Sequence, residues 1–224
     1  MGWRRVELMK DSGFSLVELL VAIVVGGIII SVAYMLFISN QRTYIIQDEL
    51  VSIQQTIRPA AEYISKHIRI AGLDPDQTGL FGIRGATNST IEFSFDRVND
   101  GLGTPLQGVL EPTDEIKAFR VLNSELQEMD QATNTWETIA ENVEVLNFVY
   151  LNSNGNVIID PAANQGAIRT VEISIIGVSR NPVLRYTNNN SYVNLQGTEI
   201  LAPQNDNFVR MMFSETVQCR NLGL

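Results

Sequence analysis

The chain has 224 residues and a formal net charge of −9, with 16 Lys and Arg against 25 Asp and Glu. Phosphate binding needs clustered basic side chains, and the sequence has no basic stripe, so nucleic acid is not expected as a partner.

The single cysteine, Cys219, cannot form a disulfide within the chain. We expect it to be a small buried residue in the last strand, the alternative being a bridge between chains.

The N-terminus is a short charged leader followed by a long apolar run. Between Phe14 and Ser39 the only charged residue is Glu18, and the run exceeds the roughly 20 residues that cross a bilayer as a helix. No small-x-small cleavage site follows Ser39, in contrast to an ordinary secretory signal. Three basic residues precede the run, so the positive-inside rule predicts a cytoplasmic N-terminus and an exported remainder.

Glu18 is unusual because a lone carboxylate inside the hydrocarbon costs at least about 2.5 kcal/mol. We therefore expect a cationic partner for Glu18. The alternative is a plain signal-anchor helix that carries an accidental glutamate.

The run Gly13-Phe14-Ser15-Leu16-Val17-Glu18 resembles the signal of type IV prepilins and type II secretion pseudopilins. The resemblance implies that a prepilin peptidase cuts between Gly13 and Phe14 and methylates the new amine of Phe14. It also implies that Glu18, at the fifth mature position, pairs with the Phe14 ammonium of a neighbouring subunit. A glycine before the scissile bond suits this chemistry because it lets a protease approach the backbone closely.

Beyond the membrane segment, apolar residues recur at three- and four-residue steps from Ile46 to Ala71, which predicts an amphipathic helix. A continuous helix from Phe14 to Ala71 would be about 87 Å long at roughly 1.5 Å per residue. Pro59 predicts a bend in this helix, and Gly72 is a suitable residue to end it.

Gly26 and Gly27 weaken the membrane half of this helix. The sequence does not favour either of two interpretations of these glycines. They allow close packing between transmembrane helices, or they allow the segment to unfold in part and extend.

After Gly72 the sequence predicts a mainly β head that lies against the polar half of the helix stalk. The alternation in Ile168–Val178 predicts a strand with one buried face and one face in water. Asn154-Gly155 predicts a hairpin. The expected strands are Thr90–Asp96, Glu115–Leu122, Val143–Leu151, Val157–Ile159, Ile168–Val178, Tyr192–Leu195 and Phe208–Cys219.

The predicted fold class is therefore α+β, similar to type IV pilins, with a long N-terminal helix, half of it transmembrane, packed against a C-terminal antiparallel β-sheet. Four regions follow from this organisation. They are a leader (1–13), a transmembrane and assembly helix (14–39), an amphipathic stalk helix (40–72) and a mainly β periplasmic head (73–224).

Within the family the chain is most similar to PilW-type minor pilins. The similar stretches are Gln41-Arg42-Thr43-Tyr44, Arg58, Arg69-Ile70-Ala71-Gly72 and Cys219-Arg220-Asn221. The position of Arg42 between Gln41 and Thr43 departs from the group. The J-type pseudopilin of type II secretion, which has a similar helix-plus-β plan, is the nearest rival.

The resemblance implies a minor pilin that primes or caps a type IV pilus as a structural subunit. The implied partners are the prepilin peptidase, other minor pilins, the major pilin and the assembly platform of the bacterial inner membrane. The implied location is that membrane, crossed once, and then the filament or its tip. A J-type pseudopilin and, at lower rank, a signal-anchored periplasmic binding module are the alternatives.

Catalysis is not expected, because His67 stands in the stalk helix and nothing in the sequence brings it to Cys219. No phosphate-binding glycine loop or zinc-ligand spacing is present, so no cofactor is expected. Acidic clusters in Asp74-Pro75-Asp76 and in residues 96–101 lack EF-hand spacing. Turn formation explains these residues better than a metal site, and no metal is predicted.

Overall fold

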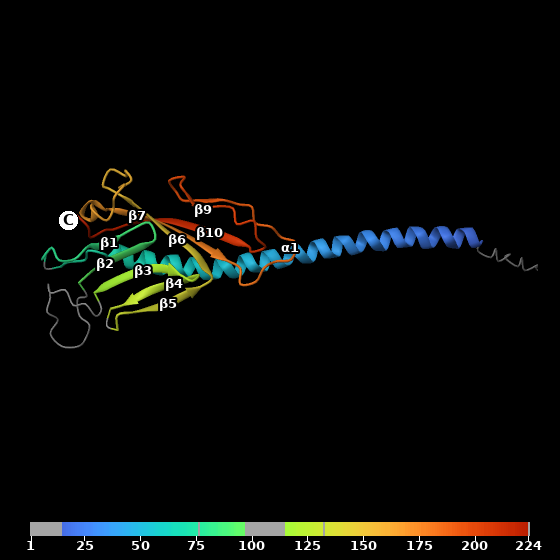
Figure 1. Cartoon of the computed structure of the whole chain (residues 1–224), viewed down its shortest axis with the longest axis horizontal. Helices are drawn as coiled ribbons and strands as arrows, with labels where there is room; N and C mark the ends of the chain where they lie inside the picture. The colour runs from blue at the N-terminus through green and yellow to red at the C-terminus, as the bar shows by residue number, and fades with distance from the viewer. Residues whose placement is uncertain (1–14, 76, 97–114, 132, 224) are drawn as a thin grey trace, which may run out of the picture. The chain divides into compact units, whose positions relative to one another are not determined.

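The computed structural model describes residues 15–75, 77–96, 115–131 and 133–223. In this part, one long helix, α1 (Leu16–Ile70), is followed by ten strands and a short 3-10 helix. Figure 1 shows the strands gathered around the C-terminal part of α1. All strand pairs are antiparallel. The predicted α+β class, with a long N-terminal helix and an antiparallel sheet, is confirmed.

Residues 46–70 of α1 cover the sheets with the predicted apolar stripe. Its spacing of three and four residues places these side chains on one helix face. Pro59 lies inside α1, which continues through it without a break. The buried members of the stripe are Ile53, Ile57, Ala60, Ala61, Ile64 and Ile68.

The end of α1 is held by residues from two distant parts of the chain. Gly72 has φ of +75°, the left-handed conformation that ends many helices, so the predicted stop is confirmed. Its N–H donates to the Ser94 carbonyl at 2.9 Å. Asn221 Nδ2 donates to the Arg69 carbonyl at 3.3 Å. A Cβ on Gly72 would come within 2.3 Å of Leu222, so the site needs glycine for space as well as for conformation.

The first sheet has five strands in chain order, β1 to β5, joined by antiparallel pairs. Its outer strands are β1, whose Arg84 carbonyl accepts from Gln165 Nε2 at 2.8 Å, and β5. The strands are β1 (Ile83–Ala86), β2 (Thr90–Ser94), β3 (Ile116–Leu122), β4 (Glu125–Asp130) and β5 (Thr135–Glu141).

The second sheet has three strands in the order β10-β7-β6. Its central strand is β7 (Thr170–Val178), between β6 (Val143–Leu151) and β10 (Arg210–Gln218). A 3-10 helix, η1 (Gln165–Ala167), precedes β7, and the small pair β8 (Tyr192–Val193) and β9 (Glu199–Leu201) lies between β7 and β10 in the chain.

The core lies between α1 and the two sheets, and one strand glycine allows its closest contact. A Cβ on Gly177 of β7 would lie 2.5 Å from Ile53 and 2.6 Å from Ile57. Glycine inside a strand often marks such a close approach of another element. Gly177 therefore lets α1 lie directly on β7.

The prediction of a wet face on β7 is wrong, because Val171 to Gly177 are all buried. The segment around β8 and β9 covers the second face. Gln196 Nε2 donates to the Glu172 carboxylate at 3.0 Å, and Asn194 Nδ2 donates to Asn147 at 3.1 Å.

Other strand predictions had mixed outcomes. The hairpin at Asn154-Gly155 is confirmed, with Gly155 at φ of +77° and the Asn152 N–H donating to Asn156. The expected strand Val157–Ile159 is reduced to one bridge between Val157 and Leu151. The sequence prediction missed β1, β4, β5 and β9.

Candidate processing and assembly site

The first turn of α1 holds the candidate assembly residue Glu18. Ser15 precedes the helix, and its Oγ accepts from the Glu18 N–H at 3.2 Å. A serine followed three residues later by glutamate is the spacing of a capping box. An acidic side chain in the first turn also stabilises the positive end of a helix. Glu18 thus has a local structural role besides the predicted pairing.

Gly13 and Phe14, the predicted cleavage and methylation residues, lie outside the described residues. The pairing of Glu18 with the Phe14 amine of a neighbouring subunit stays a prediction.

The surface that follows Glu18 is apolar on all sides. The large apolar side chains from Leu16 to Ile38 are between 37% and 75% exposed. The helix contains a window of mean hydropathy 2.7, which is long and apolar enough to cross a membrane. Such exposure costs about 25 cal/mol per Å² in water. Apolar surroundings, such as the interior of a membrane, would therefore stabilise this part of α1.

Gly26 and Gly27 form a small-residue patch on this surface. A Cβ built on either glycine meets nothing within 4 Å. The Ser31 hydroxyl donates to the Gly27 carbonyl at 2.8 Å, a bond that satisfies the hydroxyl within its own helix. The space beside both glycines is open to a neighbouring helix.

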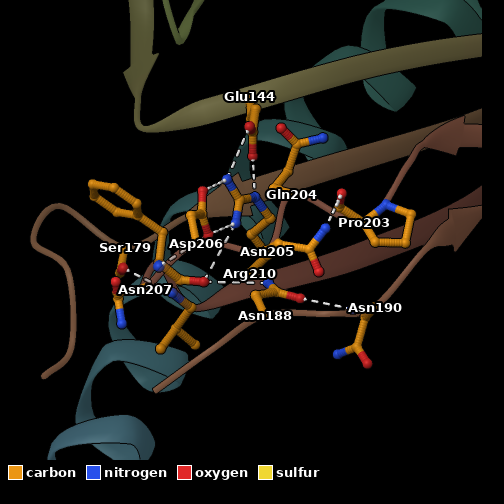
Figure 2. A network of polar contacts seen from close by, with 12 residues as sticks. Glu144, Ser179, Asn188, Asn190, Pro203, Gln204, Asn205, Asp206, Asn207 and Arg210 are labelled. Atoms are coloured by element: carbon orange, nitrogen blue, oxygen red, sulfur yellow. Dashed lines mark hydrogen bonds and ion pairs between the residues drawn. The ribbon is translucent and has the colours of Figure 1, made fainter. Parts of the chain in front are cut away.

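In the head, Arg210 is the centre of a buried ion-pair network (Figure 2). Its side chain is 4% exposed. Its guanidinium donates to Asp206 at 2.6 and 2.7 Å and to Glu144 at 2.5 and 3.2 Å. The hydrogen bonds from Arg210 lower the pKa of Asp206, and those carboxylates raise the pKa of Arg210. The network joins β10 to β6 and to the segment that precedes β10.

Asparagine and serine side chains extend this network (Figure 2). Asn188 Nδ2 donates to the Phe208 carbonyl at 3.2 Å, and the Ser179 hydroxyl accepts from the Val209 N–H at 3.0 Å. The long connection between β7 and β10 is therefore held at both of its ends. Sequence reasoning missed this network; the available signal was the pair Asp206 and Arg210, four residues apart at the start of the last strand.

The two candidate nucleophile-type residues have structural contacts. The His67 Nδ1 lies 2.8 Å from the Tyr63 carbonyl, and its ring lies 4.4 Å from the Tyr63 ring. Cys219 is buried, and burial raises the pKa of its thiol to about 12. No hydrogen bond among the described residues joins Cys219 to His67. Cys219 is buried, as expected, but it lies one residue beyond the end of β10 and not within the last strand.

The first acidic loop forms a turn. Asp74 Oδ2 accepts from the Gly79 N–H at 2.6 Å and from the Thr78 hydroxyl at 3.2 Å. Asp76 and most of residues 96–101 lie outside the described chain. In the part that the structure describes, no group of three or more acidic, histidine or cysteine side chains could hold a metal.

The comparisons with known proteins place a family motif on the N-terminal segment. Residues 8–34 match the prokaryotic N-terminal methylation motif. Among solved structures the chain is similar to a type IV-like pilin from Thermus thermophilus, with 14% identity and a TM-score of 0.48, over 80% of this chain and 98% of that chain. No curated protein sequence matches the chain. The matched segment includes Gly13, Phe14 and Glu18, the three residues that the sequence analysis selected.

Proposed function

We propose that the chain is a minor pilin, a membrane-stored subunit that primes or caps a type IV pilus after cleavage between Gly13 and Phe14. The observation that carries the proposal is the methylation motif at residues 8–34, followed by a helix with apolar side chains exposed on all sides. A helix of this kind is stored in lipid and then packs among the helices of other pilins. The chain itself performs no chemistry in this role.

Glu18 is the proposed assembly residue. In the filament its carboxylate pairs with the methylated Phe14 amine of an adjacent subunit, so assembly provides the cation that a lone helix lacks. Prepilin peptidase, other minor pilins, the major pilin and the inner-membrane assembly platform are the proposed partners. Three basic residues in the leader favour a cytoplasmic N-terminus and a periplasmic head.

A J-type pseudopilin at the tip of a type II secretion pseudopilus is the second candidate. The same motif and the same helix support it, because both systems use peptidase-processed subunits. The similar stretches around Gln41 and Arg69 favour the minor pilin.

The test is intact mass and N-terminal sequencing of the chain coexpressed with a prepilin peptidase. We expect a product that begins at methylated Phe14. The Gly13→Ala variant should be cut normally or slowly, whereas Gly13→Leu should keep the leader because its side chain obstructs the protease. An uncut Met1 terminus in the wild-type chain would contradict the proposal and favour a signal-anchored binding module.

A further inference from the structure

A groove lies between the C-terminal part of α1 and β10. It is lined by α1 residues between Pro59 and Arg69 and by Glu215 of β10, and its volume is about 680 Å³. Sites for small molecules commonly have volumes of about 300–1,000 Å³. Both sides of the groove belong to one compact unit, residues 46–224. The groove is therefore a feature of the head itself and is large enough for a small molecule.

The hydroxyl of Ser65 lies in this groove without a hydrogen-bond partner. Ser65 is 2% exposed, and its Oγ is buried. The hydroxyls of Ser31, Thr43 and Thr56 in α1 each donate to the carbonyl four residues earlier, a common bond in helices. Ser65 makes no such bond in the described chain, although buried polar atoms nearly always have a partner. Its hydroxyl is therefore free to bond to a molecule in the groove.

Glu215 supplies a second unpartnered atom to the groove. Its side chain is half-buried, and its Oε1 is buried and has no hydrogen-bond partner among the described residues. Burial raises the pKa of this carboxyl, Arg69 opposes the rise, and Glu62 adds to it. A hydrogen-bond donor in the groove would satisfy this oxygen, and a cationic donor would also favour the charged form of Glu215.

The groove is lined by two charged side chains of each sign. Glu62 and Glu215 are acidic, and Lys66 and Arg69 are basic. In the part of the chain that the structure describes, none of these four side chains makes an ion pair. The two basic side chains would repel a metal ion. A ligand that carries one charge of each sign suits these surroundings better.

We propose that this groove binds a small zwitterion, either a free α-amino acid or a short peptide. An ammonium group has three donors and no acceptor, so it matches the Glu215 carboxylate and the Ser65 hydroxyl. The carboxylate of the ligand lies beside Lys66 and Arg69, which are exposed and can turn toward it. The proposal gives the head a ligand site and does not depend on the proposed function.

Isothermal titration calorimetry of the full chain in detergent tests the proposal. The probes are L-alanine and trialanine, which differ in the distance between their two charges. N-acetyl-trialanine and trialanine amide, each without one of the charges, are the matched controls. We expect a zwitterion to bind with a Kd below about 1 mM and both controls to bind about tenfold more weakly.

The two probes separate the two sources of the ligand. Tighter binding of L-alanine would support a free amino acid, and tighter binding of trialanine would support a peptide. Binding of neither probe would overturn the proposal. Binding of the two controls as tight as that of trialanine would also overturn it, because the charges would then have no role.

Two variants connect the binding with the groove. Glu215→Gln keeps the shape of the side chain and removes its charge, so it should weaken zwitterion binding by about tenfold. In this variant the affinities for trialanine and its N-acetyl form should become equal. Ser65→Ala removes a buried hydroxyl that has no partner, so it should keep its stability in urea and weaken binding by about fivefold.

Glu137→Gln is the control variant, because Glu137 is exposed on β5 and does not line the groove. It should bind the zwitterion like the wild-type chain. Ser65→Ala alone decides the outcome if Glu215→Gln does not fold. Wild-type affinity in the folded groove variants would overturn the proposal.

Discussion

Glu18 joins a local role in the first turn of α1 to a proposed role between subunits. Its N–H is capped by Ser15, and its carboxylate stands at the start of an apolar helix. The bond to Ser15 requires only the backbone of Glu18 and the side chain of Ser15. Replacement of the Glu18 side chain therefore keeps this bond, while it removes the carboxylate that the proposed pairing needs.

The Glu18→Ala and Glu18→Val variants should be cleaved and inserted into the membrane like the wild-type chain. We expect their recovery in sheared filaments to fall by about tenfold or more, the equivalent of about 1.4 kcal/mol of lost pairing. The measurement is the amount of the chain in sheared and membrane fractions. Glu7→Ala is the control, because Glu7 leaves with the leader. Normal filament recovery of the Glu18 variants would contradict the pairing.

Gly177 is the residue on which the contact between α1 and β7 depends. The Gly177→Ala variant places a methyl group within 2.6 Å of Ile53 and Ile57, so these side chains or the helix that carries them must shift. We expect the free energy of unfolding of the full chain in detergent to fall by about 1–3 kcal/mol. Urea titration monitored by circular dichroism measures this. Gly166→Ala is the control, because a Cβ there meets nothing within 4 Å; an equal effect of both variants would refute the explanation.

At the scale of elements, β10 is held in the head by the Arg210 network. Arg210 joins β10 to β6 through Glu144 and to the preceding segment through Asp206. Because the hydrogen bonds from Arg210 lower the pKa of Asp206 below 3.8, the folded chain binds this proton less readily than the unfolded chain. The stabilisation of the folded chain by the Asp206–Arg210 pair is present above pH 3.8. It is lost as the pH falls through the lower pKa that Asp206 has in the folded chain.

The Arg210→Met variant should lower the free energy of unfolding by about 2 kcal/mol near pH 7, because charged hydrogen bonds are lost. Below pH 3.8 the loss of stability with acid should be shallower than in the wild-type chain. Urea titrations between pH 7 and pH 3 measure both effects. Arg180→Met is the matched control, since the Arg180 pair with Glu141 is exposed and should contribute little. Equal pH profiles for the Arg210 variant and the wild type would contradict the network's role.

Local patterns predicted the elements that carry a strong period. The apolar steps from Ile46 to Ala71 predicted the C-terminal part of α1, and the strand Val143–Leu151 was predicted with the bounds of β6. By contrast, β4 and β5 contain several acidic and polar residues without a clear alternation, and they were missed. Such strands form because they pair with a neighbour and not because of their own composition.

At the scale of the whole molecule, the reactivity of Cys219 shows whether the head is folded. It is buried at the end of β10, and its thiol has a pKa raised to about 12 by burial, so little thiolate exists at neutral pH. Thiolate is the reactive form of cysteine. Only an opening that exposes the core therefore makes this residue reactive.

We expect iodoacetamide at pH 8 to leave Cys219 unmodified in the folded chain and to modify it fully in urea. Intact mass measures the label, and the Cys219→Ser variant should take none. Rapid labelling of the folded chain would show that the head opens readily. A disulfide-linked dimer on a non-reducing gel would instead favour the bridge between chains.

The sequence by itself determined the N-terminal motif, the long helix and the β character of the head, because each depends on the spacing of residues close in the chain. Gly13, Phe14 and Glu18 are recognised by their positions relative to one another and need no knowledge of the fold. The covered face of β7 and the pairing of Arg210 with Glu144 were decided only by the tertiary structure. They depend on which distant segments of the chain lie side by side, and the local spacing of apolar residues does not predict this.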